Sequence, residues 1–105
     1  MIQKIKNILG IGPKVNIDEL IASGAMIMDV RSRQEYLSGH VKGSVNIPLD
    51  QLGDGIKKLK NKEQAIITCC ASGMRSGVAK TMLKSNGFIT VHNGGSWMSL
   101  KKYSK

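Results

Sequence analysis

Short apolar runs alternate along the chain with segments whose apolar residues recur every three or four positions. Continuous apolar runs of strand length cover 25–30 and 65–69, as expected for strands that are covered on both faces. Two more strands are expected at 44–47, which is followed by Pro48, and at 88–91. Strands that alternate with helical segments in this way predict an α/β sandwich with a mostly parallel sheet.

The helices predicted between these strands have capping residues and one apolar face. Asn16 followed by Glu19, and Ser32 followed by Glu35, are capping arrangements that begin helices. The expected helices cover 2–9, 16–22, 32–39, 50–60 and 76–86, with a short terminal helix after Gly94 and Gly95 that carries Trp97 and Leu100. The inner face of the helix at 76–86 is expected to hold Val78, Ala79, Met82 and Leu83.

Length and composition indicate one domain. The chain has 105 residues, of which 41% are apolar, and this suffices for a single hydrophobic core. We expect a helical extension over 1–12 and a folded domain over 13–105. No apolar run approaches the roughly 18 residues that cross a bilayer. Lys4 and Lys6 interrupt the apolar stretch that a secretion signal would need. Membrane association and export are therefore not expected.

The chain is basic, with a formal net charge of +9. This surplus suits anionic partners, including nucleic acid or acidic protein surfaces. The lysines gather on the surfaces of expected helices and near residue 105, and only four aromatic residues are available to stack on bases. Nucleic acid is therefore not expected as a partner. A basic binding domain remains an alternative supported by charge alone.

The two cysteines, Cys69 and Cys70, are adjacent. Neighbouring cysteines cannot form a disulfide scaffold, so we expect reduced thiols and a cytoplasmic location. No Cys-x-x-Cys motif is present, and His40 and His92 show no metal-ligand spacing to the cysteines. The sequence therefore predicts no metal site.

The chemistry is expected beyond the carboxyl ends of the strands, where open α/β sheets bind ligands. Cys70 ends a predicted strand and precedes a short loop and a helix. Loop amides and a helix N-terminus form an anion cradle that lowers the pKa of a thiol. An inert buried thiol is the alternative, but the following segment favours a reactive thiolate. The cradle is formed by Ala71, Ser72, Gly73, Met74, Arg75 and Ser76.

At these residues the sequence resembles the rhodanese family of sulfurtransferases. The stretch from Cys70 to Ser76 matches the family's Cys-x-x-Gly-x-Arg-Ser pattern. Three further segments are similar to family signatures: Asp29-Val-Arg31 followed by Glu35-Tyr36, Gly39-His-Val-Lys-Gly-Ser-Val-Asn-Ile-Pro48, and Asn93-Gly-Gly-Ser-Trp97. Together they cover about residues 15–100 in the family's order.

The resemblance implies a rhodanese-like three-layer sandwich, with a five-stranded, mainly parallel sheet and helices on both faces. It implies a sulfurtransferase in which Cys70 takes a sulfane sulfur from a donor such as thiosulfate and holds it as a persulfide. The sulfur then passes to cyanide, a thiol or a protein. Arg75 would orient the donor's oxyanion and Ser76 would hydrogen-bond the sulfur. Neither a metal nor an organic cofactor is needed.

Two other functions are compatible with the same motif. One is a rhodanese-like module that carries or senses sulfur with a protein partner. The other is a phosphatase or arsenate reductase. Four residues separate Cys70 from Arg75, whereas the phosphatase signature has five, and the shorter loop favours a bound sulfur atom over a phosphoryl group.

The remaining candidates have structural interpretations. Asp29 and Arg31 are expected to form an ion pair that supports the active loop. Glu35 is expected to begin a helix and to pair with a nearby basic residue.

His40 is expected to lie in a turn and Trp97 to pack near the sheet end. Met74 either selects the donor or fills space. Cys69 is expected to be a small buried hydrophobe, with a redox role as resolving thiol for Cys70 as the alternative.

Overall fold

Four parallel strands form one sheet in the computed structural model, which describes residues 16–105. The strands lie in the order β2-β1-β3-β4. Their bounds are β1 (Met26–Asp29), β2 (Val45–Asn46), β3 (Ile66–Cys70) and β4 (Val91–Ser96). Because all pairs are parallel, their carboxyl ends meet at one edge of the sheet. The predicted helical extension over 1–12 lies outside the described residues.

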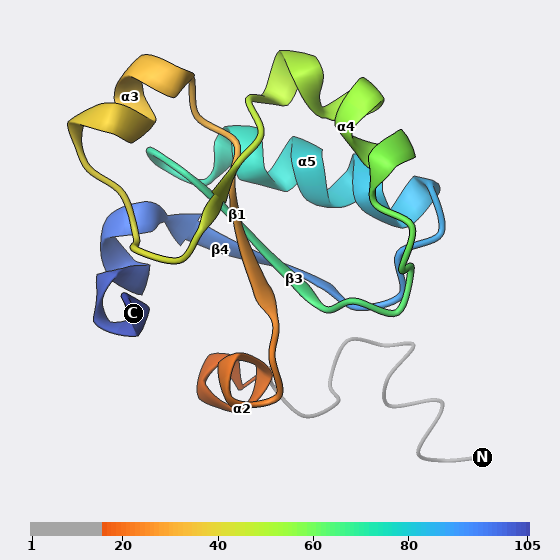
Figure 1. Ribbon diagram of the computed structural model, residues 1–105, viewed down its shortest axis with the longest axis horizontal. Helices are drawn as coiled ribbons and strands as arrows, with labels where there is room; N and C mark the ends of the chain where they lie inside the picture. The colour runs from red at the N-terminus through yellow and green to blue at the C-terminus, as the bar shows by residue number, and fades with distance from the viewer. Residues whose placement is uncertain (1–15) are drawn as a thin grey trace.

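Helices cover both faces of this sheet. The α-helices are α2 (Ile17–Ala22), α3 (Arg33–Ser38), α4 (Leu52–Lys58) and α5 (Met74–Ser85), and two 3₁₀ helices are η1 (Leu49–Gln51) and η2 (Trp97–Tyr103). Helices α4 and α5 lie over one face, and α2 and η2 lie over the other (Figure 1). The predicted three-layer α/β architecture is confirmed. None of the helices in residues 16–105 has the length and apolar character needed to cross a membrane.

The central strand β3 is buried along its whole length and divides the core into two clusters. Ile66 and Cys70 point toward the cluster beneath α4 and α5. Ile67 and Cys69 point toward the opposite cluster, which includes Leu100 of η2. This alternation follows from the two-residue period of a strand. It places Cys70 on the α5 side of the sheet, where the helix that follows it begins.

The predicted helix starts at Asn16 and Ser32 are confirmed. The side chain of Asn16 accepts a hydrogen bond of 3.1 Å from the backbone N–H of Glu19. Ser32 and Glu35 form a complete capping box, in which each side chain accepts from the other residue's backbone N–H. These local bonds satisfy amides that have no partner within the helix.

The expectation of five strands is wrong for residues 16–105, where the sheet has four. Three of the predicted segments each cover most or all of one strand, the fourth strand begins at the end of the segment 88–91, and the chain before β1 forms helix α2. The fifth strand was implied only by the family resemblance. No further segment of residues 16–105 forms a strand of this sheet.

The fourth strand lies later in the chain than the predicted segment 88–91. It covers Val91–Ser96, and Phe88 packs in the core before the strand begins. The expected turn at the two glycines is also wrong, since both lie within the strand. A Cβ at Gly94 would stand 2.8 Å from a side-chain carbon of Ile67 and 3.0 Å from the carbonyl oxygen of Thr68. Glycine is needed there for close packing against β3.

Helix α5 begins at Met74 rather than at Ser76, because Gly73 adopts the N-cap position. The predicted inner face of this helix is partly confirmed. Ala79 and Leu83 are fully buried, whereas Val78 is 52% exposed. A helix that begins two residues earlier has Arg75 and Ser76 in its first turn.

Candidate active site

Cys70 is the last residue of β3 and is followed by a tight connection to α5. Gly73 has a φ of 106°, a conformation that side chains disfavour, and it turns the chain into the helix. A Cβ at this position would also stand 3.4 Å from the Cα of Gly95 in β4. Any other residue at position 73 would therefore have a strained backbone, and its side chain would contact the neighbouring strand.

The sulfur of Cys70 lies at the N-terminus of α5 and accepts two backbone hydrogen bonds. The N–H of Gly73 is 3.0 Å from the sulfur and the N–H of Ser76 is 3.3 Å away. The N-cap residue of this helix is Gly73, so no N-cap side chain accepts hydrogen bonds from the first amides of the helix. The sulfur therefore occupies the place that a capping oxygen takes in other helices, where an anion is stabilised by the helix dipole.

These bonds make Cys70 more acidic than an ordinary thiol. Burial raises the pKa of Cys70, but hydrogen bonds from the side chain and backbone of Ser76 and from the backbones of Gly73 and Ser72 outweigh it, and the net pKa is lowered. The residue is only 1% exposed. Backbone amides of the predicted anion cradle therefore bind the sulfur, and we call the N–H groups of Gly73 and Ser76 around it the collar.

Asn93 is part of this site and was not among the predicted site residues. Its side-chain oxygen lies 2.6 Å from the hydroxyl oxygen of Ser76, and its amide donates to the carbonyl of Gly73 over 3.1 Å. Asn93 pairs with Thr68 in the sheet, and one extra residue of β4 follows before Ser96 pairs with Cys70. Such bulges redirect side chains beside functional sites. The sequence signal for Asn93 was its place at the start of the segment Asn93-Gly-Gly-Ser-Trp97, which is similar to a family signature.

Arg75 forms an ion pair with Glu35 of α3. Two guanidinium nitrogens lie 2.7 Å and 3.0 Å from the two carboxylate oxygens of Glu35. Hydrogen bonds from Arg75 are the main cause that lowers the pKa of Glu35 to about 2. The expected basic partner of Glu35 is thus Arg75. The contacts with Glu35 are the main cause that raises the pKa of Arg75, and the charge of Cys70 makes a smaller contribution.

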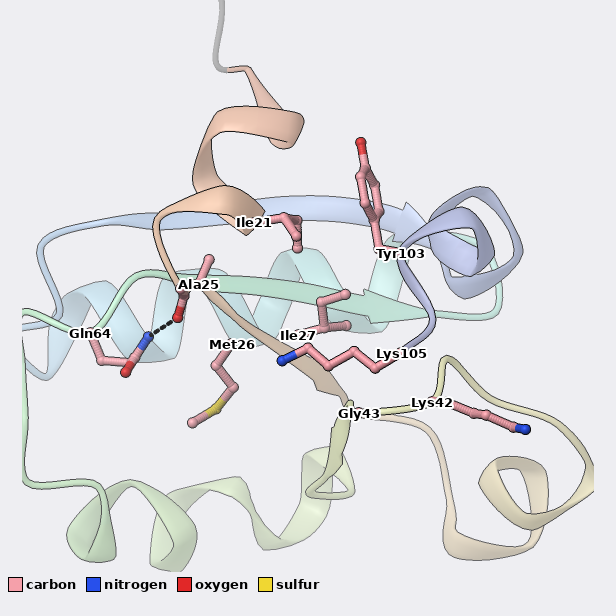
Figure 2. Close-up of a pocket in the computed structure, with 10 residues that line it drawn as sticks. Ile21, Ala25, Met26, Ile27, Lys42, Gly43, Gln64, Tyr103 and Lys105 are labelled. Atoms are coloured by element: carbon pink, nitrogen blue, oxygen red, sulfur yellow. Dashed lines mark hydrogen bonds between the residues drawn. The ribbon is translucent and has the colours of Figure 1, made fainter.

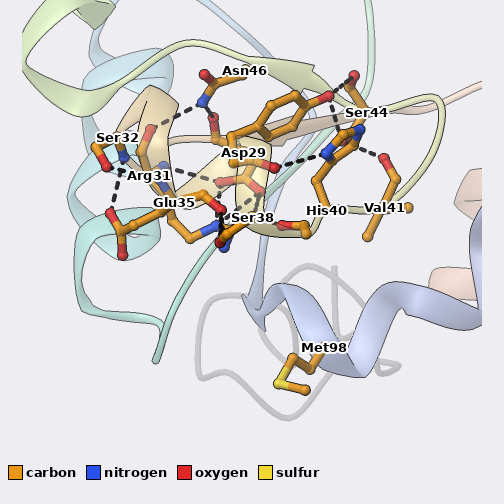
Figure 3. Close-up of polar contacts among 12 residues, drawn as sticks. Asp29, Arg31, Ser32, Glu35, Ser38, His40, Val41, Ser44, Asn46 and Met98 are labelled. Carbon is orange, nitrogen blue, oxygen red and sulfur yellow. Dashed lines mark hydrogen bonds and ion pairs between the residues drawn. The ribbon is translucent and has the colours of Figure 1, made fainter.

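Asp29 and Arg31 form the predicted ion pair, and both are buried. The shortest nitrogen–oxygen distance between them is 2.7 Å. Arg31 also donates to the carbonyl oxygens of Glu35 and Gly39, so it ties the end of β1 to both ends of α3 (Figure 3). Its guanidinium lies 4.5 Å from the ring centre of Trp97. The pair therefore fixes the helix that holds Arg75 in place.

The other predicted residues occupy the rim or lie away from the sulfur. Ala71 and Ser72 are exposed, and Met74 is 82% exposed. His40 stacks on the ring of Tyr36 and its Nδ1 lies 2.8 Å from the Tyr36 carbonyl oxygen. This contact agrees with the structural role expected for His40.

Cys69 lies on the opposite face of the sheet from Cys70. It is fully buried in the cluster that contains Ile67 and Leu100. Burial, with a smaller contribution from Asp29, raises the pKa of Cys69 to about 12. Both cysteines are free thiols. The expectation of a small buried side chain at Cys69 is confirmed.

Two of the cavities in the described residues lie at different ends of the sheet. One of about 330 Å³ borders Arg75 and is lined also by Val30, Ser32 and Leu49. The other, of about 200 Å³, lies near the start of β1 between Lys105 and Gln64 (Figure 2). Only the first adjoins the loop that follows Cys70. Within residues 16–105, no three His, Cys, Asp or Glu side chains come together as metal ligands.

Comparison with known proteins gives a consistent family. The rhodanese-like domain family matches residues 15–100. Thiosulfate sulfurtransferase PspE of Escherichia coli is 35% identical over 69 residues, which cover 65% of this chain and 66% of PspE. YrkF of Bacillus subtilis, for which a sulfur-carrier role has been proposed, is 38% identical over 80 residues that cover 76% of this chain and 40% of YrkF. The chain thus spans less than two thirds of these relatives.

Solved structures show the same fold. The human single-domain sulfurtransferase TSTD1 has a TM-score of 0.70 and 27% identity, with 82% of this chain and 89% of that one covered. A rhodanese with anions from Escherichia coli has a TM-score of 0.66 and 32% identity, with 71% and 89% covered. The family motif and the sulfur at the helix N-terminus agree with these matches, and the chain belongs to the rhodanese-like domain family.

Proposed function

We propose that the protein is a thiosulfate sulfurtransferase-type enzyme in which Cys70 is the catalytic residue. The observation that carries this proposal is the collar around the Cys70 sulfur. Two backbone N–H groups, of Gly73 and Ser76, point at the sulfur from 3.0 Å and 3.3 Å. A thiolate is the nucleophilic form of cysteine, and oriented amides at a helix N-terminus stabilise it.

The reaction has two steps. The Cys70 thiolate attacks the outer sulfur of thiosulfate, forming a sulfur–sulfur bond to Cys70 while the bond to the sulfonate sulfur breaks and sulfite leaves with the electron pair. Cyanide, a thiolate or a protein thiolate then attacks the outer sulfur of the persulfide, and the Cys70 thiolate is regenerated. The charge returns to the same sulfur in each cycle, so a fixed set of donors serves both steps.

The loop residues have separate roles in this proposal. Ala71, Ser72 and Met74 form the exposed rim that a donor meets first. Arg75 binds the oxyanion of the sulfur donor. A guanidinium carries five N–H groups, and Glu35 does not use all of them. The Arg75 side chain is 38% exposed, so the remaining N–H groups can reach a bound anion. The buried pair of Asp29 and Arg31 supports α3 and therefore the position of Glu35.

A sulfur carrier that acts with a protein partner is the second candidate. The ion pair between Arg75 and Glu35 favours it, because the guanidinium is partly neutralised before a small anionic donor arrives. The exposed Met74 beside the collar offers apolar contact to a protein surface. The match to YrkF agrees with this role. In either role a reducing compartment such as the cytoplasm keeps Cys70 as a free thiol.

Intact mass spectrometry after incubation with thiosulfate tests the proposal. We expect a gain of one sulfur atom that cyanide removes as thiocyanate. Cys70→Ala should not load, and Cys69→Ala, which removes the neighbouring thiol on the other face, should load like the unmodified protein. If Cys69→Ala loads more slowly than the unmodified protein, the second thiol takes part and the single-cysteine mechanism is contradicted.

Sulfur loading, together with assays of phosphatase activity and nucleic-acid binding, separates the alternatives. Loading from a persulfidated protein but not from thiosulfate or polysulfide would favour the carrier. Hydrolysis of a phosphate monoester without sulfur loading would favour a phosphatase. Salt-sensitive binding of nucleic acid without loading would favour a basic binding domain.

A further inference from the structure

The hydroxyl group of Ser76 has one proton and three neighbours that can accept it. The side-chain oxygen of Asn93 is 2.6 Å from the hydroxyl oxygen, the carbonyl oxygen of Gly73 is 3.1 Å away, and the sulfur of Cys70 is 3.4 Å away. A hydroxyl donates only one hydrogen bond at a time. The three acceptors therefore compete.

While Cys70 is protonated, the Ser76 hydroxyl donates its proton to Asn93. The thiol proton points to the Ser76 oxygen, and the hydroxyl proton then goes to the nearest acceptor, Asn93. The chain of donors runs from sulfur to hydroxyl to amide oxygen. In this state the hydroxyl presents its lone pairs to Cys70.

Ionisation of Cys70 reverses the direction of the hydrogen bond between the sulfur and the Ser76 hydroxyl. A thiolate is only an acceptor, so it is stabilised when the Ser76 hydroxyl turns its proton from Asn93 to the sulfur. The Asn93 oxygen then keeps the hydrogen bond of 3.0 Å that the N–H of Gly95 donates to it. Gly95 has a φ of 77°, which brings this N–H back toward the Asn93 side chain. The amide oxygen therefore loses one partner but not both.

We propose that Asn93 is a positioning residue that sets how readily Cys70 ionises, by competing with the sulfur for the hydroxyl proton of Ser76. Its amide group supports the same arrangement through its bond to the Gly73 carbonyl. That carbonyl also accepts from the N–H of Gly77, so the loop has a second anchor when Asn93 is removed. The proposal deepens the proposed function and rests on it for its relevance to sulfur transfer.

The charged groups around Cys70 are already paired, which leaves the hydroxyl as the adjustable contact. From α5, Arg75 is paired with Glu35 of α3. From the end of β1, Asp29 is paired with Arg31. These pairs remain in place whichever way the hydroxyl points, because none of their hydrogen bonds involves Ser76.

Two further titratable groups lie close in the sequence to the site. His92 precedes Asn93 on β4, and burial together with Lys80 of α5 lowers the pKa of His92. Cys69 keeps its proton, because burial raises its pKa to about 12. Both shifts favour the uncharged forms of these two side chains.

The test is the pH dependence of alkylation of Cys70 by iodoacetamide, followed by intact mass. In Asn93→Ala the competing acceptor is gone, and we expect the midpoint to fall by about one pH unit, the order expected for one hydrogen bond to a charged group. A residue that only held the collar together would give the opposite result, because a loosened collar raises the midpoint. An unchanged or raised midpoint in Asn93→Ala overturns the proposal.

A double-mutant cycle with Ser76→Ala tests the route of the effect. Without the hydroxyl there is no proton to compete for, so the midpoint of Asn93→Ala/Ser76→Ala should equal that of Ser76→Ala. A fall of the same size in both backgrounds overturns the proposal. Asn46→Ala is the matched control, because Asn46 is also half-buried and donates to two backbone carbonyls, those of Asp29 and Arg31. Its midpoint should match the unmodified protein.

Asn93→Asp keeps the shape of the side chain and serves if Asn93→Ala does not fold. A carboxylate binds the hydroxyl proton more strongly and adds a negative charge, so the midpoint should rise, and a fall would overturn the proposal. Sulfur loading is measured separately in the unmodified protein. If loading fails while these shifts appear, the proposed function is wrong and the control of ionisation by Asn93 stands.

Discussion

Glu35 and Arg75 form a bidentate ion pair that joins the first turn of α3 to the first turn of α5. The two residues are 40 positions apart in the sequence, and their charged atoms approach to 2.7 Å. The arginine of the cysteine loop is therefore oriented before any donor binds. Glu35 has two functions in the fold, since it also completes the capping box with Ser32.

Glu35→Gln should reduce stability at neutral pH and lose its effect in acid. The pKa of Glu35 is lowered from 4.5 to about 2 in the folded protein. A carboxyl whose folded pKa is depressed stabilises the fold above its unfolded pKa, and this contribution disappears as the pH falls through the folded value. The difference between the two proteins in urea denaturation should therefore narrow as the pH falls from 4.5 toward 2.

Salt provides the control for this prediction. Both side chains are more than a third exposed, so the ion pair is screened by solvent and the difference should shrink in concentrated salt. A difference that is constant with pH would show that the carboxylate charge does not contribute.

Gly73→Ala should lower stability and raise the pKa of Cys70. A side chain at a positive φ costs about 1–2 kcal/mol, and relief of this strain moves the Gly73 N–H away from the sulfur. Gly24→Ala is a matched control, because Gly24 has a φ of 97° and open space around its Cα. Both variants should lose stability in urea denaturation, but only Gly73→Ala should shift the alkylation midpoint upward. Equal midpoints would contradict the role of this amide.

Arg31→Met should be among the most destabilising single changes in the chain. It leaves the carboxylate of Asp29, which is fully buried, without its ionic partner. Breaking one side of a buried ion pair costs about 3–5 kcal/mol. The double variant Asp29→Asn/Arg31→Met should lose less stability than the sum of the two single variants, as measured by urea denaturation. Additive losses would show that the two side chains do not act as a pair.

Cys69→Ala should leave the oxidation of Cys70 unchanged. The two side chains point to opposite faces of the sheet, and the pKa of Cys69 is raised to about 12, so it supplies no thiolate to resolve an oxidised Cys70. Inactivation by hydrogen peroxide and recovery with dithiothreitol should proceed at the same rates in both proteins. Faster irreversible loss in Cys69→Ala would restore the resolving role. The stability of the variant should fall by about 1 kcal/mol because buried volume is lost.

Much of the site follows from local patterns in the sequence. Cys70 at a strand end, a glycine three residues later and a helix after it are enough to predict an anion cradle, since backbone amides at a helix N-terminus are determined by neighbours in the chain. The capping box of Ser32 and Glu35 is predicted for the same reason. Strand alternation places Cys69 and Cys70 on opposite faces before any tertiary contact is known.

Other features depend on contacts between distant segments. The partner of Arg75 was unknown because Glu35 reaches it only when α3 and α5 lie at the same edge of the sheet. The fourth strand was placed too early because Gly94 and Gly95 indicate a turn locally, whereas close packing against Ile67 and Thr68 selects glycine within a strand. Asn93 was passed over because an amide side chain has no chemical signature of its own.

The sequence by itself determined where the Cys70 sulfur lies, which amides bind it and which helix follows, because these groups are within seven residues of one another. Tertiary structure decided which charges are paired and where the hydroxyl proton of Ser76 goes. Those outcomes depend on distances of a few ångströms between β4, α3 and α5, and such distances are fixed only when the sheet brings these elements together.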